Sequence, residues 1–204
     1  FIETAVRLCQ KGLCAALVTA PISKKALNLS GVDFPGHTEM LASLVGSRRV
    51  AMVIYSEKMA VAFATLHEPL RSVGERLTAQ RLVEVGTLLN RYLKLLRNKA
   101  PRIAVLGLNP HAGEEGLFGD EEERFVAPAV RRLVSLGVKA EGPVPPDVAF
   151  TPQALERYDG HLALYHDQGS IPFKMLSFDT GVNLTMGLGV IRTSPDHGTA
   201  FDIA

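Results

Sequence analysis

Short apolar runs alternate with helical patterns along most of the chain, and this alternation limits the folds that the sequence can adopt. Each run is apolar almost throughout, as is typical of strands that are covered on both faces of a sheet. Helical spacing is clearest over 78–97, where Thr78 is a plausible N-cap, and over 122–136. The expected strands are 15–20, 49–55, 59–65, 102–108 and 161–166. This alternation predicts an α/β fold with a largely parallel sheet.

One part of the sheet is expected to be antiparallel. The runs 49–55 and 59–65 are joined by the short polar turn Ser56–Lys58, which is typical of a hairpin. The chain begins with Phe1 inside a helical pattern and stops at Ala204 without a cap. We therefore expect residues 1–204 to be the central and C-terminal part of a longer α/β chain, with subdomain boundaries near residues 100 and 160.

Composition excludes several classes of function. The formal net charge of +1 gives no basic surface for nucleic acid. The chain contains no apolar run of the roughly 18–20 residues that a membrane span requires. Cys9 and Cys14 lack a second pair for a zinc knuckle and are expected to be reduced thiols of a cytoplasmic protein.

Three of the six histidines occupy similar positions near the mouths of loops. His37 follows a Pro–Gly turn in "FPGHTEM", where Thr38 is the expected N-cap of a helix. His111 in "AVLGLNPHAG" and His166 in "LALYHDQG" each follow a predicted strand. In open α/β sheets, ligands bind just beyond the carboxyl ends of strands, so the loops of His111 and His166 are expected to form a wall of the active site.

The chemistry of three imidazoles suits a divalent metal. Neutral histidines bind borderline ions such as zinc or cobalt, and three protein ligands leave one position for a substrate oxygen. Their spacing matches no local metal motif, so hydrogen-bonding loop residues remain an alternative for each. We expect His67 and His161 to be structural.

Acidic and amide side chains lie close to these histidines in the sequence. Asn109, Asp147 and Asp167 could orient metal ligands through hydrogen bonds. The carboxylates of 120–123 are interpreted differently, as the solvated start of a helix whose dipole favours negative charge.

A second set of polar residues could bind an anionic substrate. Lys174, Asn183 and Arg192 lie close to predicted loop ends, and the planar guanidinium of arginine binds phosphate or carboxylate through two hydrogen bonds. A solvated surface charge is the alternative, above all for Lys174. Arg192 lies between an apolar run and a turn, which favours a binding role.

Six motifs carry a family resemblance. They are "TAPISKKAL", "FPGHTEMLA", "GLNPHAGEEGLFGDEE", "GPVPPDVAF", "YHDQGSIPFK" and "GLGVIRTSPDHGTAFDIA". Together the motifs resemble the 4-hydroxythreonine-4-phosphate dehydrogenase family of vitamin B6 biosynthesis. This resemblance implies an isocitrate/isopropylmalate-dehydrogenase-like three-layer α/β/α fold, mostly parallel with some antiparallel strands. It also implies a homodimer whose active site lies at the subunit interface.

The resemblance also implies roles for single residues. His37, His111 and His166 would hold a divalent metal (zinc, magnesium or cobalt), with ligands shared across the dimer. Substrate-binding positions of the family fall on three residues: Lys174, Asn183 and Arg192.

A nicotinamide cofactor, NAD or NADP, is implied as well. The segment "DHGTAFDIA" resembles the loop that holds the adenosine of NAD in the wider superfamily, which makes His197 and Gly198 candidates for cofactor binding. A base must accept the proton of the substrate hydroxyl, and the candidates are Lys24 in "APISK" and Asp147.

The implied reaction is the oxidation of 4-phosphohydroxy-L-threonine, followed by loss of CO2 from the resulting β-keto acid. Several alternatives remain open. A related dehydrogenase could act on 4-phosphoerythronate, 4-phosphothreonate or a cis-dihydrodiol. Outside this class, the chain could be a metal-dependent lyase or hydrolase that uses no nicotinamide, or a non-catalytic metal-binding or dimerisation module.

Overall fold

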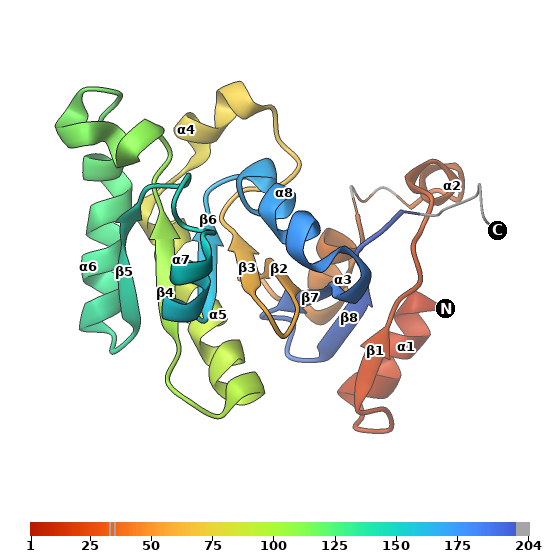
Figure 1. Ribbon diagram of the computed structural model, residues 1–204. Helices are drawn as coiled ribbons and strands as arrows, with labels where there is room; N and C mark the ends of the chain where they lie inside the picture. Colours follow the sequence, from red (N-terminus) through yellow and green to blue (C-terminus); the bar gives the residue numbers. More distant parts are fainter. Residues whose placement is uncertain (33, 35, 199–204) are drawn as a thin grey trace.

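A single mixed sheet with helices on both faces organises the chain (Figure 1). The computed structural model describes residues 1–32, 34 and 36–198. Within these residues the sheet has eight strands, in the order β1-β8-β7-β2-β3-β6-β4-β5. The strands are β1 (Ala16–Val18), β2 (Ala51–Tyr55), β3 (Ala60–Phe63), β4 (Arg102–Leu106), β5 (Lys139–Val144), β6 (Gly160–Ala163), β7 (Val182–Met186) and β8 (Ile191–Pro195).

Strand direction separates the sheet into two regions. The neighbours β3, β6, β4 and β5 are mutually parallel, and β1 is parallel to β8. The pairs β2–β3, β2–β7 and β7–β8 are antiparallel. The first of these is the hairpin predicted around Ser56–Lys58, so the expected α/β fold with some antiparallel pairing is confirmed.

The helices are α1 (Ile2–Gln10), α2 (Lys24–Leu29), α3 (His37–Val45), α4 (Val73–Arg76), α5 (Ala79–Arg97), α6 (Ala127–Ser135), α7 (Pro152–Arg157) and α8 (His166–Ser177). Shorter turns are η1 (Leu70–Ser72), η2 (Pro110–Gly116), the π-helical η3 (Glu122–Val126) and η4 (Phe178–Thr180). In the described part of the chain, none of the helices has the length and apolar composition that crossing a membrane requires.

One face of the sheet is covered by α5 and α6. The expected N-cap is confirmed, because the Thr78 hydroxyl accepts a hydrogen bond from the Arg81 amide at 3.1 Å. The buried side of α5 packs on the strands, and α5 lies so close to α6 that a Cβ on Gly86 would be 2.8 Å from a methyl of Leu133. This layer forms the largest buried cluster.

The opposite face is covered in part by α8. Phe173 of α8 is fully buried against Ile54, Val61 and Phe63 of the sheet. Beyond α8, the same face continues over β7 and β8, where polar side chains replace apolar ones. A third, smaller cluster joins α1 and α3 to the β1 end of the sheet through residues such as Val6 and Leu41.

Two local expectations need correction. His166 does not end a strand: β6 ends at Ala163, and His166 is the first residue of α8, with Tyr165 at the N-cap. Thr38 is not the N-cap of α3; that position is occupied by Gly36. The helix therefore starts at His37, because the extended backbone of the glycine ends the preceding turn.

The subdomain boundaries expected near residues 100 and 160 stay a prediction. One sheet joins strands from both sides of each position, since β6 pairs with β3 on one side and β4 on the other.

Candidate active site

A cavity of about 310 Å³ lies on the face of the sheet beside α8. The register of β2, β7 and β8 brings the side chains of Met52, Asn183, Thr185, Arg192 and Ser194 to this face. Loop residues complete the wall. The lining includes Gly36, His37, Thr38, Leu66, His67, His197 and Gly198.

Arg192 is the only positively charged side chain among the described residues that line this cavity, apart from the histidines. It is 4% exposed, and its guanidinium donates to the hydroxyl of Thr19 (2.7 and 3.1 Å) and to that of Thr185 (3.0 Å). Burial lowers the pKa of Arg192, but a guanidinium remains charged in proteins. Because none of its described partners is acidic, the buried charge favours an incoming anion.

Two neighbours of Arg192 complete this anion site. Asn183 donates through Nδ2 to Met52 Sδ at 3.2 Å, while its Oδ1 is buried without a hydrogen-bond partner among the described residues. Burial, together with the nearby charge of Arg192, lowers the pKa of His37. The His37 imidazole is therefore neutral at pH 7. Its N–H group can donate a hydrogen bond to a ligand oxygen.

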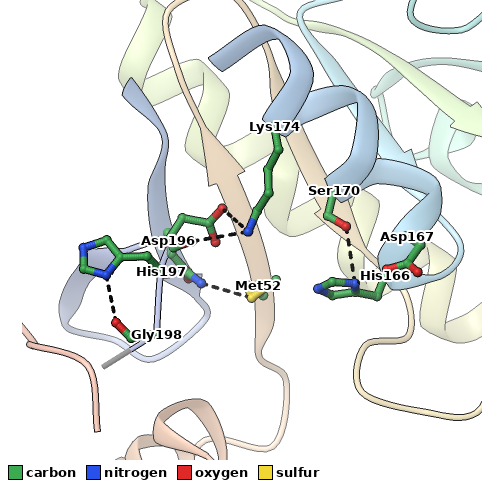
Figure 2. A network of polar contacts seen from close by, with 9 residues as sticks. Met52, His166, Asp167, Ser170, Lys174, Asp196, His197 and Gly198 are labelled. Atoms are coloured by element: carbon green, nitrogen blue, oxygen red, sulfur yellow. Dashed lines mark hydrogen bonds and ion pairs between the residues drawn. The ribbon is translucent and has the colours of Figure 1, made fainter. Parts of the chain in front are cut away.

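His166 lies at the first turn of α8, at the edge of a second cavity of about 590 Å³. Its Nδ1 is 2.6 Å from Oδ1 of Asp167 and 3.3 Å from the hydroxyl of Ser170 (Figure 2). The ring stacks on Phe63 at a centroid distance of 6.0 Å and lies 5.7 Å from the ring of His67. His67 lines both cavities and so joins the anion site to His166.

His111 projects from the tight left-handed turn that follows β4. Its Nδ1 is 2.7 Å from Oε2 of Glu114, and this carboxylate raises the pKa of the imidazole. All residues from His111 to Glu115 have positive φ; the first, His111, has a φ of 53° and the last, Glu115, has a φ of 55°. Non-glycine residues rarely adopt this conformation, so the backbone here is strained in a way that is typical of functional loops.

These histidines fit a metal site in the kind of donor that they offer. In His111 and His166, a carboxylate occupies Nδ1 and leaves Nε2 as the outward donor, which is the arrangement usual for metal-ligating histidines. Within the described residues of one chain, however, no three His, Cys, Asp or Glu side chains are grouped closely enough to hold a metal. The convergence of His37, His111 and His166 across a dimer remains a prediction.

His67 is expected to be structural, and this expectation stays a prediction. The structure places it exposed between two cavities and close to His166, which makes it a further candidate site residue. The sequence signal is its position after β3, since His166 likewise follows β6. By contrast, His161 is fully buried in β6, and its ring nitrogen contacts the Ala149 carbonyl at 2.8 Å, as expected for a structural histidine.

Lys174 lies beside the anion cavity and does not line it. From α8 its Nζ reaches the Asp196 carbonyl (3.5 Å) and carboxylate (3.7 Å), as Figure 2 shows. Burial is the largest influence on Asp196 and raises the pKa of its carboxyl group. Next to it, His197 contacts the carbonyl of Gly198 at 2.8 Å, and both residues line the cavity. The rest of "DHGTAFDIA", residues 199–204, lies outside the described part.

The two base candidates differ in what can be said of them. Asp147 is exposed and lines a groove together with Asp167, and its charge contributes to the raised pKa of His111. It therefore faces the metal candidates rather than the Arg192 cavity. Lys24 begins α2, but its side chain lies outside the described structure.

Glu122 contradicts the expectation of a solvated helix start at 120–123. It is 4% exposed, and its Oε1 accepts hydrogen bonds from the amides of Leu108 (2.7 Å) and Asn109 (2.8 Å). Its Oε2 accepts from Asn109 Nδ2 at 3.0 Å. The carboxylate is buried because it satisfies the backbone where β4 ends and the His111 turn begins.

Comparison with known proteins gives consistent relatives. A 4-hydroxythreonine-4-phosphate dehydrogenase from Geobacter metallireducens is 49% identical over 200 residues, covering 98% of this chain and 59% of that protein. A D-threonate 4-phosphate dehydrogenase from Salmonella typhimurium is 48% identical over 203 residues, covering 100% and 62%. The chain thus spans about three fifths of the length of these relatives.

Solved structures agree with this. A 4-hydroxythreonine-4-phosphate dehydrogenase from Klebsiella pneumoniae superposes with a TM-score of 0.91 at 51% identity, covering all of this chain and 61% of that one. A β-decarboxylating dehydrogenase from Thermococcus kodakarensis, with a TM-score of 0.55 at 13% identity, shares the fold. The family model for the pyridoxal phosphate biosynthetic protein PdxA matches residues 1–204. The chain therefore belongs to the PdxA family.

Proposed function

We propose that this chain is the larger part of an NAD(P)-linked dehydrogenase that oxidises and decarboxylates 4-phosphohydroxy-L-threonine in vitamin B6 biosynthesis. The observation that carries the proposal is the buried guanidinium of Arg192, whose hydrogen-bond partners are the hydroxyls of Thr19 and Thr185, in a cavity of small-molecule size that Glu39 also lines. Such a site suits a small anionic substrate, and the names of two relatives support a phosphorylated hydroxythreonine as that substrate.

Arg192 is the principal substrate-binding residue in this proposal. Its guanidinium offers charged donors to a phosphate oxygen, the neutral His37 adds a donor, and the free Oδ1 of Asn183 accepts from a substrate N–H or O–H. Lys174 would contribute from the rim if its contact with Asp196 opens on binding. Burial of the Arg192 guanidinium away from bulk water strengthens its attraction for the anion.

The reaction needs one proton acceptor and one hydride acceptor. The secondary hydroxyl would lose its proton to a protein base, and a bound nicotinamide would supply the acceptor for the hydride from the carbon that bears this hydroxyl. The product is a β-keto acid, whose C–C bond to the carboxylate then breaks with release of CO2. The electron pair of that bond is delocalised into the ketone as an enolate, which takes up a proton. Asp147 and Lys24 remain the proposed bases.

His111 and His166 would hold the divalent metal through Nε2, because Glu114 and Asp167 already occupy their Nδ1 atoms. His37 was expected as the third ligand, but the position of His67 close to His166 favours His67. A bound zinc, magnesium or cobalt ion would act as a Lewis acid that stabilises negative charge on the substrate oxygen.

Two further proposals concern the cofactor and the assembly. His197 and Gly198 are the proposed contacts of the adenosine part of NAD or NADP, next to the substrate cavity. A homodimer with the active site between subunits is proposed because the metal ligands are not grouped within the described part of one chain. The outer side of α8 and the following turn expose Ile171, Met175 and Phe178, an apolar surface that suits a subunit contact.

A second substrate is favoured by one comparison. The Salmonella relative is a D-threonate 4-phosphate dehydrogenase at nearly the same identity as the Geobacter protein. The two substrates share a phosphate and a secondary hydroxyl, and they differ in the amino group. Asn183 suits either substrate, since its free Oδ1 can accept from an amine as well as from a hydroxyl.

The test is a turnover assay with the complete, metal-loaded protein. Reduction of NAD or NADP is followed by nicotinamide absorbance with 4-phosphohydroxy-L-threonine, with D-threonate 4-phosphate, and with the unphosphorylated form of each. We expect turnover with a phosphorylated substrate and little without the phosphate. Equal rates with and without phosphate, or no nicotinamide signal with any substrate, would refute the proposal.

A further inference from the structure

The hydrogen-bond ladder between β4 and β6 changes its character where the active site begins. The last rung pairs Val105 with Leu162. The same register would bring Gly107 opposite Leu164, but here the side chain of Gln168 joins the two backbones. The Leu164 amide donates to Gln168 Oε1 at 2.7 Å, and Gln168 Nε2 donates to the Gly107 carbonyl at 2.7 Å. A buried side-chain amide thus takes the place of a rung.

This bridge belongs to a line of hydrogen bonds across the carboxyl ends of four parallel strands. After β3, the Thr65 hydroxyl donates to the Leu164 carbonyl at 2.8 Å. On the other side, the Gly107 amide donates to the Val144 carbonyl of β5 at 2.9 Å. Gln168, which is 7% exposed, is the one link in this line that comes from a helix.

Each of the four strands leads directly into a candidate site residue. His67 follows β3, His166 follows β6, His111 follows β4, and Asp147 follows β5. Gln168 is therefore placed between the backbones that carry His166 and His111. Two backbones bridged by a side-chain amide lie farther apart than two backbones joined by a direct N–H to C=O hydrogen bond. The Gln168 amide therefore holds these strand ends at a fixed, wider separation.

The backbone on the His111 side of the bridge is tightly packed. A Cβ on Gly107 would lie 2.9 Å from the Cα of Ala112, in the turn that presents His111. Glu122 fixes the intervening backbone by accepting from the amides of Leu108 and Asn109. A displacement of the Gly107 carbonyl is therefore passed on to the His111 turn rather than absorbed by a flexible loop.

We infer that Gln168 is a positioning residue that sets the separation of His111 and His166, and this inference rests on the proposed function. Gln168 does not line the Arg192 cavity. Both of its polar ends are hydrogen-bonded to backbone atoms, so the amide is held in one geometry and can act as a spacer. These two hydrogen bonds explain why a glutamine is buried in the first turn of α8.

Two substitutions separate the effect of the length of the Gln168 side chain from the effect of its amide group. Gln168→Met keeps the length of the side chain and removes both hydrogen bonds. Gln168→Asn keeps the amide but is too short to contact both strands. The matched control is Asp159→Asn, because Asp159 joins the other ends of the same strands by accepting from the Arg102 amide at 2.9 Å, beside β6. It also loses the charge that contacts Lys99 at 2.7 Å, so it lowers stability far from the histidines.

Three quantities are measured on the complete protein: zinc affinity by calorimetry, hydrogen exchange of the Leu164 amide without metal, and the urea midpoint of unfolding. Both Gln168 variants are expected to lose about tenfold in zinc affinity, as is typical when a residue behind the metal ligands is changed. They should also speed exchange at Leu164. Asp159→Asn should lower the urea midpoint while zinc affinity and Leu164 exchange stay at wild-type values.

The outcomes are distinguishable. If the Gln168→Asn variant keeps wild-type zinc affinity, the presence of an amide matters and the length of the side chain does not. The spacer role would then be wrong. Unchanged Leu164 exchange in both Gln168 variants, or equal loss of zinc affinity in the control, would also overturn the inference. A wild-type protein that binds zinc but turns over no phosphorylated substrate refutes the proposed function alone. A wild type that binds no metal refutes both.

Discussion

Arg192 illustrates how a single side chain can define a ligand class. A buried cation is costly unless an anion or several hydrogen bonds compensate for its lost hydration. Here the partners are the hydroxyls of Thr19 and Thr185, which orient the guanidinium but do not neutralise it. The folded protein therefore keeps an electrostatic preference for a negative ligand at this position, and burial together with the charge of Arg192 lowers the pKa of His37, which favours its neutral form.

His161 provides a prediction for stability at low pH. Burial lowers the pKa of this histidine to about 4, its ring stacks on Phe150 at 4.8 Å, and its Nε2 contacts the Ala149 carbonyl. In the unfolded chain the pKa is about 6.5. Between these values only the unfolded state binds the proton, so stability is unaffected above pH 6.5 and falls as the pH drops towards 4. The full effect is about 3 kcal/mol.

Urea unfolding of wild type and His161→Gln across this pH range measures the effect. Glutamine can keep a donor for the Ala149 carbonyl but does not titrate. We expect the variant to be less stable near neutral pH and to show a shallower decline with acid. Parallel pH profiles for the two proteins would show that His161 is not the group responsible.

For single residues, the sequence predicted the type of interaction better than the position of the side chain in the fold. Arg192, Asn183 and His197 line one cavity as a substrate and cofactor set would. The role of His37 was interpreted from its loop, and only the fold shows that it faces Arg192. Glu122 is expected to be exposed to solvent, because runs of acidic residues usually are. It is buried because it accepts hydrogen bonds from backbone amides of a turn whose shape no local sequence pattern reveals.

Among the secondary-structure elements, apolar strands were predictable and site-forming strands were not. β2, β3, β4 and β6 are buried on both faces, and their composition reveals them. β7 and β8 carry the polar side chains of the cavity wall, including Asn183 and Arg192, so their pattern resembles loops. β5 contains Gly142 and Pro143, which normally indicate a turn. The pattern thus fails where a strand exchanges core packing for a binding surface.

The N-cap of α5 gives a prediction at this scale. The Thr78 hydroxyl accepts from the Arg81 amide, which otherwise has no partner in the first turn. Thr78→Ala should lower the free energy of unfolding by about 1 kcal/mol, because an N-cap hydrogen bond is lost. Thr78→Ser keeps the acceptor and serves as the control in the same urea titration. Equal stability of all three proteins would mean that water replaces the cap at no cost.

For the whole molecule, the exposed apolar side of α8 gives a prediction that tests the proposed dimer. Met175 is 81% exposed, and the neighbouring Ile171 and Phe178 are 57% and 73% exposed. Introducing a charge with Met175→Glu should shift the complete protein from dimer towards monomer in sedimentation equilibrium. The control is Leu95→Glu on α5, a leucine of similar exposure (74%) on the opposite layer. If both variants stay dimeric, the subunit contact lies elsewhere.

The overall architecture follows from sequence because its causes are local. Alternating apolar runs and helical periodicity specify three layers, and a short polar turn specifies the hairpin. The grouping of site residues depends on strand order and on helix placement, which join positions such as Thr19 and Arg192 from opposite ends of the chain. Loop-end residues and the family resemblance therefore predicted candidate residues of the site, and its geometry required the fold.

The most direct test of the account measures what Arg192 binds. Arg192→Lys keeps the charge and removes the planar fork, and Arg81→Lys is the control, because Arg81 is a partly buried arginine that donates to the Ala64 and Val50 carbonyls. In the complete protein, Arg192→Lys should raise the KM for 4-phosphohydroxy-L-threonine by at least about tenfold while the KM for NAD(P) stays unchanged. The control should change neither. Equal weakening of substrate and cofactor, or no weakening of either, would contradict the assignment of this cavity as the phosphosubstrate site.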